Sequence, residues 1–179
     1  MELKTIHSSE DVLFEKVWEI YQYSFPVHEK RKLANQREAL AKENCAIDVY
    51  SDNGKVVGFL IYWVFDTFVY LEHYAMNKEC RNQGYGSKIL KAFIEHHRPR
   101  TVILDIDPFE DEISERRLHF YLRLGFVRNI YLHVHPPYNN PEGEKFTLIL
   151  MSEGRALSQE EFDEFKNALY TQIVTYGER

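Results

Sequence analysis

The chain has 179 residues, of which 44% are hydrophobic and 28% are charged, with a formal net charge of −6. This length suits one domain with its own core, so we expect a single domain over residues 1–179. The negative net charge argues against a protein that binds nucleic acid independently of sequence. No apolar run approaches the roughly 18 residues of a membrane span and the N-terminal residues lack the order of a signal peptide, so we expect a cytoplasmic protein without membrane contact.

The first part of the chain predicts a strand, two helices and a β-hairpin. Apolar residues at helical spacing precede Pro26, which should end the first helix. Asn53-Gly54 between two alternating apolar runs is the strongest short hairpin signal available. The expected elements are, in order, a strand over 3–7, helices over 13–25 and 33–41, and strands over 46–50 and 56–65.

The second part alternates between strands and helices. Gly125 stands where the C-terminus of a helix favours glycine, and Ser158-x-x-Glu161 forms a capping box for the last helix. The expected elements are strands over 68–76, 101–107, 126–134 and 145–151, and helices over 84–97, 113–124 and 158–173. This order predicts an α/β fold, with a central mixed β-sheet flanked by helices on both faces.

Two short clusters of positive charge occur in this acidic chain. One consists of Lys30, Arg31, Lys32 and Arg37, and the other of Arg98 and Arg100. Such runs are in most cases solvated surface, and we expect that here.

The loop before the helix over 84–97 has the composition of an anion site. Its sequence is Arg81-Asn82-Gln83-Gly84-Tyr85-Gly86. Backbone N–H groups at a helix N-terminus lack partners within the helix, and glycine lets phosphate approach them closely. The loop is neither a P-loop nor a Rossmann fingerprint, because the required lysine and third glycine are missing.

The stretch from Tyr70 to Leu90 resembles the acetyl-CoA motif of the GNAT (GCN5-related) N-acetyltransferases. The loop matches their pattern [QR]-x-x-G-x-[GA]. The resemblance implies that the end of the strand meets the pantetheine arm of acetyl-CoA and that the loop holds its pyrophosphate. The cofactor-binding residues that it implies are Ala75, Met76, Arg81, Asn82, Gln83, Gly84, Tyr85, Gly86 and Ser87.

A second segment, Ser114–Phe126, resembles the family pattern N-x-x-A-x-x-F-Y-x-x-x-G-F. Phe120, Tyr121 and the final Gly-Phe match, whereas Ser114 and Arg117 replace the usual Asn and Ala. Cofactor contacts of these two side chains are therefore not carried over. The order of the expected elements extends the resemblance, which implies one GNAT acetyltransferase domain over residues 1–179.

Acyl transfer from a thioester to an amine needs a proton donor for the departing thiolate. Tyr121 is our candidate, because a phenol with a pKa near ~10 stays protonated at neutral pH. The alternative is that Tyr121 only packs beside Phe120 and Leu124.

The amine must also lose a proton. Strand alternation places Glu72 on one face with Tyr70, Tyr74 and Met76, and it is the only carboxylate of that strand. Glu72 is therefore the first candidate for the base. A bulge would exchange the faces and make His73 the candidate, and a mechanism with no dedicated base stays open.

Neither the cysteines nor the histidines have the spacing of a metal site. Cys45 and Cys80 are far apart, and the pairs His96-His97 and His133-x-His135 lack carboxylate or cysteine partners at ligand spacing. We expect no metal and no disulfide. His133, His135 and Tyr138, beside Pro136-Pro137, are better suited to an acceptor pocket.

These observations predict an N-acetyltransferase that moves an acetyl group from acetyl-CoA to a primary amine of a small molecule or peptide. A non-catalytic acyl-CoA-binding module is the main alternative, and it would not need Tyr121. A tRNA-acetylating enzyme is disfavoured by the negative charge. The identity of the amine stays open, and the sequence is compatible with a homodimer.

Overall fold

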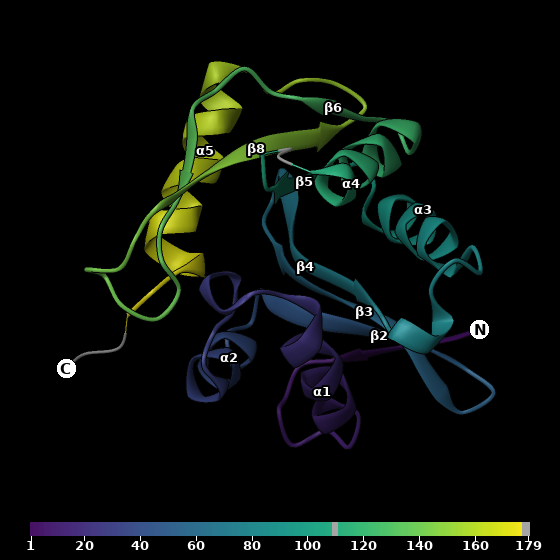
Figure 1. The fold of residues 1–179 in the computed structure, drawn as a ribbon. Coiled ribbons are helices and arrows are strands. Elements are labelled where there is room, and N and C mark those ends of the chain that lie inside the picture. The colour runs from purple at the N-terminus through teal and green to yellow at the C-terminus, as the bar shows by residue number, and fades with distance from the viewer. Residues whose placement is uncertain (109–110, 177–179) are drawn as a thin grey trace.

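The computed structural model describes residues 1–108 and 111–176 of the chain. Eight strands form one mixed sheet in the order β1-β2-β3-β4-β5-β8-β6, with β7 also paired to β8 (Figure 1). The strands are β1 (Glu2–Ile6), β2 (Cys45–Asp52), β3 (Lys55–Val64), β4 (Phe68–Met76), β5 (Thr101–Ile106), β6 (Phe126–Arg128), β7 (His133–His135) and β8 (Phe146–Glu153). The helices are α1 (Phe14–Ser24), α2 (Leu33–Leu40), α3 (Tyr85–His97), α4 (Glu112–Arg123) and α5 (Gln159–Ala168).

Helices cover both faces of the sheet, which confirms the predicted fold class. One buried cluster joins α1, α2 and α5 to side chains such as Ile47, Phe59 and Tyr70. The other joins α3 and α4 to Tyr62, Leu71 and their neighbours on the opposite face. Apolar residues therefore point to opposite sides along each central strand, as the sequence pattern requires.

The hairpin between β2 and β3 forms at the predicted place. Asn53 and Gly54 adopt positive φ angles of 48° and 77°, as the two central residues of a type I′ hairpin turn require. β1 adds to β2 in antiparallel register.

β4 and β5 separate part of the way along their length, and this opening positions the site described below. The two parallel strands pair only at Phe68–Thr101, Val69–Val102 and Tyr70–Ile103. From Leu71 onward the edge of β4 that faces β5 has no strand partner among the described residues. The sheet therefore opens into a wedge, with one wall from each strand.

The prediction of one strand over 126–134 is wrong, because this segment forms two short strands, β6 and β7, with a break between them. The interruption is stabilised by Asn129, whose side chain donates to Ser152 Oγ at 3.0 Å and accepts from the Leu157 backbone at 2.7 Å. Ile130 and Leu132 become exposed as a result. An apolar run alone does not reveal such a break.

Two helix ends follow the predicted chemistry. Ser158 and Glu161 form the predicted capping box of α5, and Gly125 after α4 has φ of 89°. The last helix differs from the expectation in its final turn, because residues 169–173 continue α5 as a wider π-type turn.

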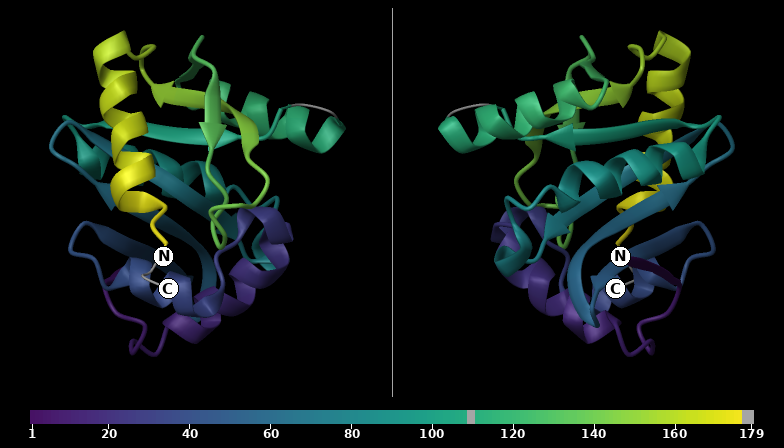
Figure 2. Two further views of the ribbon diagram at one scale, coloured as in Figure 1. Left: turned by 90° about the vertical axis from the view of Figure 1, so that its left-hand side faces the viewer. Right: turned by 90° about the vertical axis from the view of Figure 1, so that its right-hand side faces the viewer.

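The connection between β7 and β8 reaches across to the segment that follows α1 (Figure 2). Asn139 links the two, because its side chain donates to the Lys30 carbonyl at 2.8 Å and accepts from the Lys32 backbone at 2.7 Å. No helix within residues 1–108 and 111–176 is long and apolar enough to cross a membrane.

Candidate active site

A cavity of about 690 Å³ occupies the wedge between β4 and β5. The glycine loop and the start of α3 line one end, α4 contributes Phe120 and Tyr121, and the segment after α1 lines the other end. The end near the loop, where the sequence predicts the cofactor, is called the cofactor end below. The end near residues 24–29, named for the predicted acceptor, is called the acceptor end.

The loop presents its backbone to the cofactor end. Asn82 and Gly84 have φ angles of 61° and 79°, and α3 begins directly after Gly84. Tyr74 fixes the helix start, because its hydroxyl donates to the Gly86 carbonyl at 2.7 Å. The N–H groups of the first helical turn, which have no acceptor within the helix, and the positive helix end therefore lie at this wall, as an anion site requires.

Eight of the nine residues expected to bind the cofactor lie in the cavity wall. They are Ala75, Met76, Arg81, Asn82, Gly84, Tyr85, Gly86 and Ser87. Gln83 is the exception, because its exposed side chain donates to the Glu79 carbonyl at 3.0 Å instead.

Tyr121 lies in the cavity wall on α4 and is 8% exposed. Burial raises the pKa of its phenol to about 12, against a smaller opposite effect of Arg117. The hydroxyl therefore carries its proton at neutral pH and can donate it to a bound group.

β4 contains a bulge at Glu72, where the sequence left both Glu72 and His73 as candidates for the base. Ile61 pairs with His73 and Tyr62 pairs with Leu71, so that Glu72 is the extra residue. The prediction that Glu72, Tyr74 and Met76 share one face is therefore wrong. Glu72 and His73 point to the same side of the sheet, toward α1, while Tyr74 packs on the other side.

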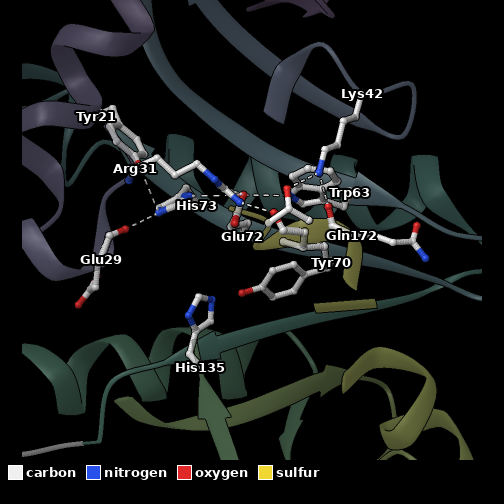
Figure 3. A network of polar contacts seen from close by, with 12 residues as sticks. Tyr21, Glu29, Arg31, Lys42, Trp63, Tyr70, Glu72, His73, His135 and Gln172 are labelled. Atoms are coloured by element: carbon white, nitrogen blue, oxygen red, sulfur yellow. Dashed lines mark hydrogen bonds and ion pairs between the residues drawn. The ribbon is translucent and has the colours of Figure 1, made fainter. Parts of the chain in front are cut away.

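Glu72 is held by a buried ion pair. Its Oε2 lies 2.6 Å from Arg31 Nη1 and accepts from Trp63 Nε1 at 2.9 Å (Figure 3). Burial alone would raise the pKa of Glu72, but the Arg31 guanidinium together with His73 and Trp63 opposes it, and the net shift is downward. A carboxylate in this state accepts a proton poorly.

Arg31 corrects the expectation that the basic run after α1 is solvated surface. Its side chain is 4% exposed. Besides Glu72 it donates to the Ile173 carbonyl at 2.9 Å, and its guanidinium lies 4.7 Å from the centre of the Tyr138 ring. Its charge-assisted bonds explain how a guanidinium is buried here, but no local sequence signal marks Arg31 among its basic neighbours.

His73 has one ring nitrogen without a partner. Its Nε2 lies 2.8 Å from the Glu29 carbonyl oxygen, which has no hydrogen, so Nε2 carries the proton and donates it. Nδ1 then has a free lone pair and no hydrogen-bond partner in the structure. Burial lowers the pKa of His73 to about 4, although Glu72 acts in the opposite direction, so the ring is neutral.

Of the expected acceptor residues, His135 and Tyr138 line the cavity. His133 is also buried, but its Nε2 donates to Asp105 Oδ2 at 2.7 Å instead. Its partner lies on β5, far away in sequence, which is why ligand spacing did not reveal the pair. Asp105 also accepts from the Tyr70 hydroxyl at 3.1 Å.

Glu29, Asp107 and His28 form a group at the acceptor end that sequence reasoning missed. Their carboxylate and imidazole atoms lie within 4.8 Å of one another, and this is the one group of metal-type ligands found in the part of the chain described. Burial and the neighbouring Asp107 raise the pKa of Glu29 to about 8. The three residues come from two distant segments, so no spacing rule detects them.

Comparison with known proteins assigns the family. The sequence model of the "Acetyltransferase (GNAT) family" matches residues 11–126. The chain therefore belongs to the GNAT acetyltransferase family, as the two motifs indicated.

Two curated relatives come from Bacillus subtilis. One from strain 168, YjbC, named as an acetyltransferase, is 33% identical over 105 residues, covering 57% of this chain and 52% of the relative. The other, from subsp. natto and named for spermine N(1)-acetyltransferase activity, is 33% identical over 88 residues, covering 42% and 55% respectively. The chain thus spans about half the length of each.

Solved structures have the same fold over most of the chain. A GNAT-family protein from Bacteroides thetaiotaomicron has a TM-score of 0.87 with 29% identity, covering 97% of this chain and 98% of its own. A GNAT acetyltransferase from Elizabethkingia anophelis with acetyl-CoA bound has a TM-score of 0.59 with 14% identity, covering 85% and 96%.

Proposed function

We propose that the protein transfers an acetyl group from acetyl-CoA to a primary amine. The observation that carries this proposal is the wedge between β4 and β5, which joins an anion-binding loop at one end to a buried tyrosine and neutral histidine further in. The amine would be part of a small molecule or a peptide, consistent with the spermine named for one relative.

Acetyl-CoA would lie along the free edge of β4. Residues from Leu71 onward offer backbone groups to pantetheine, and the N–H groups at the start of α3 suit a pyrophosphate. Two similar structures contain CoA or acetyl-CoA, which supports this assignment.

Tyr121 would protonate the departing thiolate. Its raised pKa keeps the phenol protonated, and its position inside the cavity distinguishes this proposal from a module that only binds acyl-CoA. Such a module has no need for a buried proton donor.

His73 would take the proton from the amine through Nδ1, and the ionised Glu72 lies next to this nitrogen. Nδ1 of His73 has a free lone pair and lies 3.9 Å from Glu72 Oε2, so the carboxylate would stabilise the imidazolium that forms. The ion pair with Arg31 and the hydrogen bond from Trp63 engage Glu72 Oε2 and make Glu72 the poorer candidate, whereas His73 Nδ1 has no hydrogen-bond partner. His73 is the base candidate expected for a strand that contains a bulge at this position.

A thiol-release assay tests the proposed function. The protein is mixed with acetyl-CoA and a panel of primary amines that includes alkylamines, amino sugars and short peptides. We expect amine-dependent release of CoA and an N-acetylated product by mass spectrometry. Tight binding of CoA with no turnover of any amine would favour the acyl-CoA-binding module.

A further inference from the structure

The acceptor end of the cavity contains hydrogen-bond acceptors in excess. Among the described residues, five buried side-chain atoms in the cavity wall have no hydrogen-bond partner. These atoms are Ser24 Oγ, Glu29 Oε1, Glu72 Oε1, His73 Nδ1 and His135 Nε2. The Ser24 hydroxyl can donate or accept, as can the Glu29 carboxyl while it carries its proton, whereas Glu72 Oε1 and the two histidine nitrogens accept.

The histidine assignments follow from their second nitrogens. His135 Nδ1 lies 2.6 Å from the Pro136 carbonyl oxygen, so this nitrogen carries the proton and Nε2 has the lone pair. His135 is 3% exposed, and Figure 3 shows its ring pointing from β7 toward the space between Glu29 and Tyr70. Burial lowers the pKa of His135, so the ring stays neutral.

Acidic side chains outnumber basic ones at this end. Four of them line the cavity: Glu29, Glu72, Asp105 and Asp107. Arg31 pairs with Glu72 and Arg117 lies 3.4 Å from Asp107, while Asp105 accepts from Tyr70 and His133. Glu29 is left with His28, whose Nε2 is 3.6 Å away.

Glu29 is thus a carboxyl group that lacks a strong cationic partner. Its raised pKa has the same origin, because burial and the nearby Asp107 disfavour its charge when the cavity is empty. A ligand cation placed between Glu29 and Asp107 would remove this repulsion.

Aromatic rings flank the acceptors at this end. Phe25 packs edge-on against His73 at 4.7 Å, and His28 stacks on Phe146 at 4.5 Å between ring centres. Such walls suit methylene groups and ammonium ions, which aromatic faces attract. The Phe25 and Phe146 rings have no donor for the hydroxyl groups of a sugar or the carbonyl groups of a peptide.

We propose that the acceptor substrate is an aliphatic diamine or polyamine, with its reacting nitrogen beside His73 and a second ammonium group between Glu29 and Asp107. This inference rests on the proposed acetyl transfer and names the class of amine. An ammonium group supplies three donors and no acceptor, which complements the wall described above.

The test compares amines of one chain length that differ in the charge of the far end. Putrescine, butylamine and γ-aminobutyrate carry a positive, a neutral and a negative group there. We expect kcat/KM with acetyl-CoA to fall in that order, with putrescine about 10- to 100-fold above butylamine, as for a charge-assisted hydrogen bond. The difference should reside mainly in KM.

Two variants connect this preference to Glu29. Glu29→Gln should reduce the ratio of putrescine to butylamine activity about tenfold or more, whereas Glu160→Gln, exposed on α5, should leave the ratio unchanged. The Glu29 backbone carbonyl that accepts from His73 is retained. CoA binding by calorimetry verifies that each variant is folded.

The other possible outcomes would each contradict either the diamine assignment or the proposed function. Equal turnover of butylamine and putrescine, or preference for a peptide or amino-sugar amine, would overturn the diamine assignment and leave acetyl transfer intact. Tight binding of Zn²⁺ or Mn²⁺ that Glu29→Gln abolishes, without a diamine preference, would assign the group to a metal instead. Absence of turnover with every amine would overturn the proposed function itself.

Discussion

The ion pair between Arg31 and Glu72 joins three separate segments of the chain. Arg31 follows α1, Glu72 lies in the bulge of β4, and Ile173 accepts a hydrogen bond near the C-terminus. Removing one partner of a buried pair costs about 3–5 kcal/mol, because the other charge stays buried and uncompensated. This pair therefore stabilises the bulge from which His73 reaches the cavity.

Substitutions of Glu72 and His73 should separate charge stabilisation from proton transfer. His73→Ala is expected to lower kcat/KM at neutral pH by on the order of 10²-fold, and the rate should recover as the pH approaches the pKa of the amine, where no base is needed. Glu72→Gln should mainly lower the free energy of unfolding, measured by urea denaturation. A reversed result, with pH-dependent recovery only in Glu72→Gln, would return the base assignment to Glu72.

Tyr121→Phe removes one hydroxyl from the cavity wall. We expect kcat to fall by on the order of 10²-fold, because the departing thiolate loses its proton donor, while the affinity for CoA by calorimetry stays within about twofold. The phenyl ring keeps its packing against Phe120 and Phe126. An unchanged kcat would remove Tyr121 from the mechanism.

The loop and helix α3 form the element that defines the cofactor end. Gly84 has φ of 79° directly before the first helical residue, a conformation that side chains with a branched Cβ rarely adopt. Space does not limit substitution there, since an added Cβ would meet no atom within 4 Å. The requirement is in the backbone path, which leads from the loop into the first turn of α3.

Gly84→Val is therefore expected to weaken CoA binding at least tenfold in calorimetry. The hairpin glycine provides a matched control, because Gly54 has φ of 77° and also has open space around it. Each of the two substitutions should lower the free energy of unfolding by about 1–2 kcal/mol, but Gly54→Val should leave the affinity for CoA unchanged. Equal effects of both substitutions on CoA affinity would show that strain alone, and not the loop geometry, is responsible.

The whole molecule combines histidines that are buried in neutral form with a carboxyl that is buried with its proton. Burial lowers the pKa of His73 and His97 to about 4, and it also lowers that of His135. In the unfolded chain a histidine titrates near ~6.5, so below this pH the unfolded state binds more protons and stability falls. Glu29 acts in the opposite direction between about pH 4.5 and 8, because its raised pKa makes the folded state the better proton binder.

The free energy of unfolding should consequently decrease as the pH falls from 6.5 to 5, where three histidines outweigh one glutamate. His97 offers a variant outside the cavity, since its ring packs against Tyr62 and Phe93. His97→Phe should reduce the slope of stability against pH by up to about 1.4 kcal/mol per pH unit, the value for one proton. Urea denaturation at several pH values measures this slope, and an unchanged slope would contradict the assignment.

Local patterns of the sequence determined most of the architecture and the cofactor end. Alternation, helical spacing, the Asn53-Gly54 turn and the glycine loop depend on neighbouring residues, so one segment carries all the information needed. The acceptor end was decided by the tertiary structure. The bulge at Glu72 depends on the pairing with β3, the burial of Arg31 depends on partners in β4 and the C-terminal turn, and the grouping of Glu29 with Asp107 depends on the separation of β4 from β5. Each of these contacts joins segments far apart in the chain, and their energies become available only when the sheet and its helices have packed together.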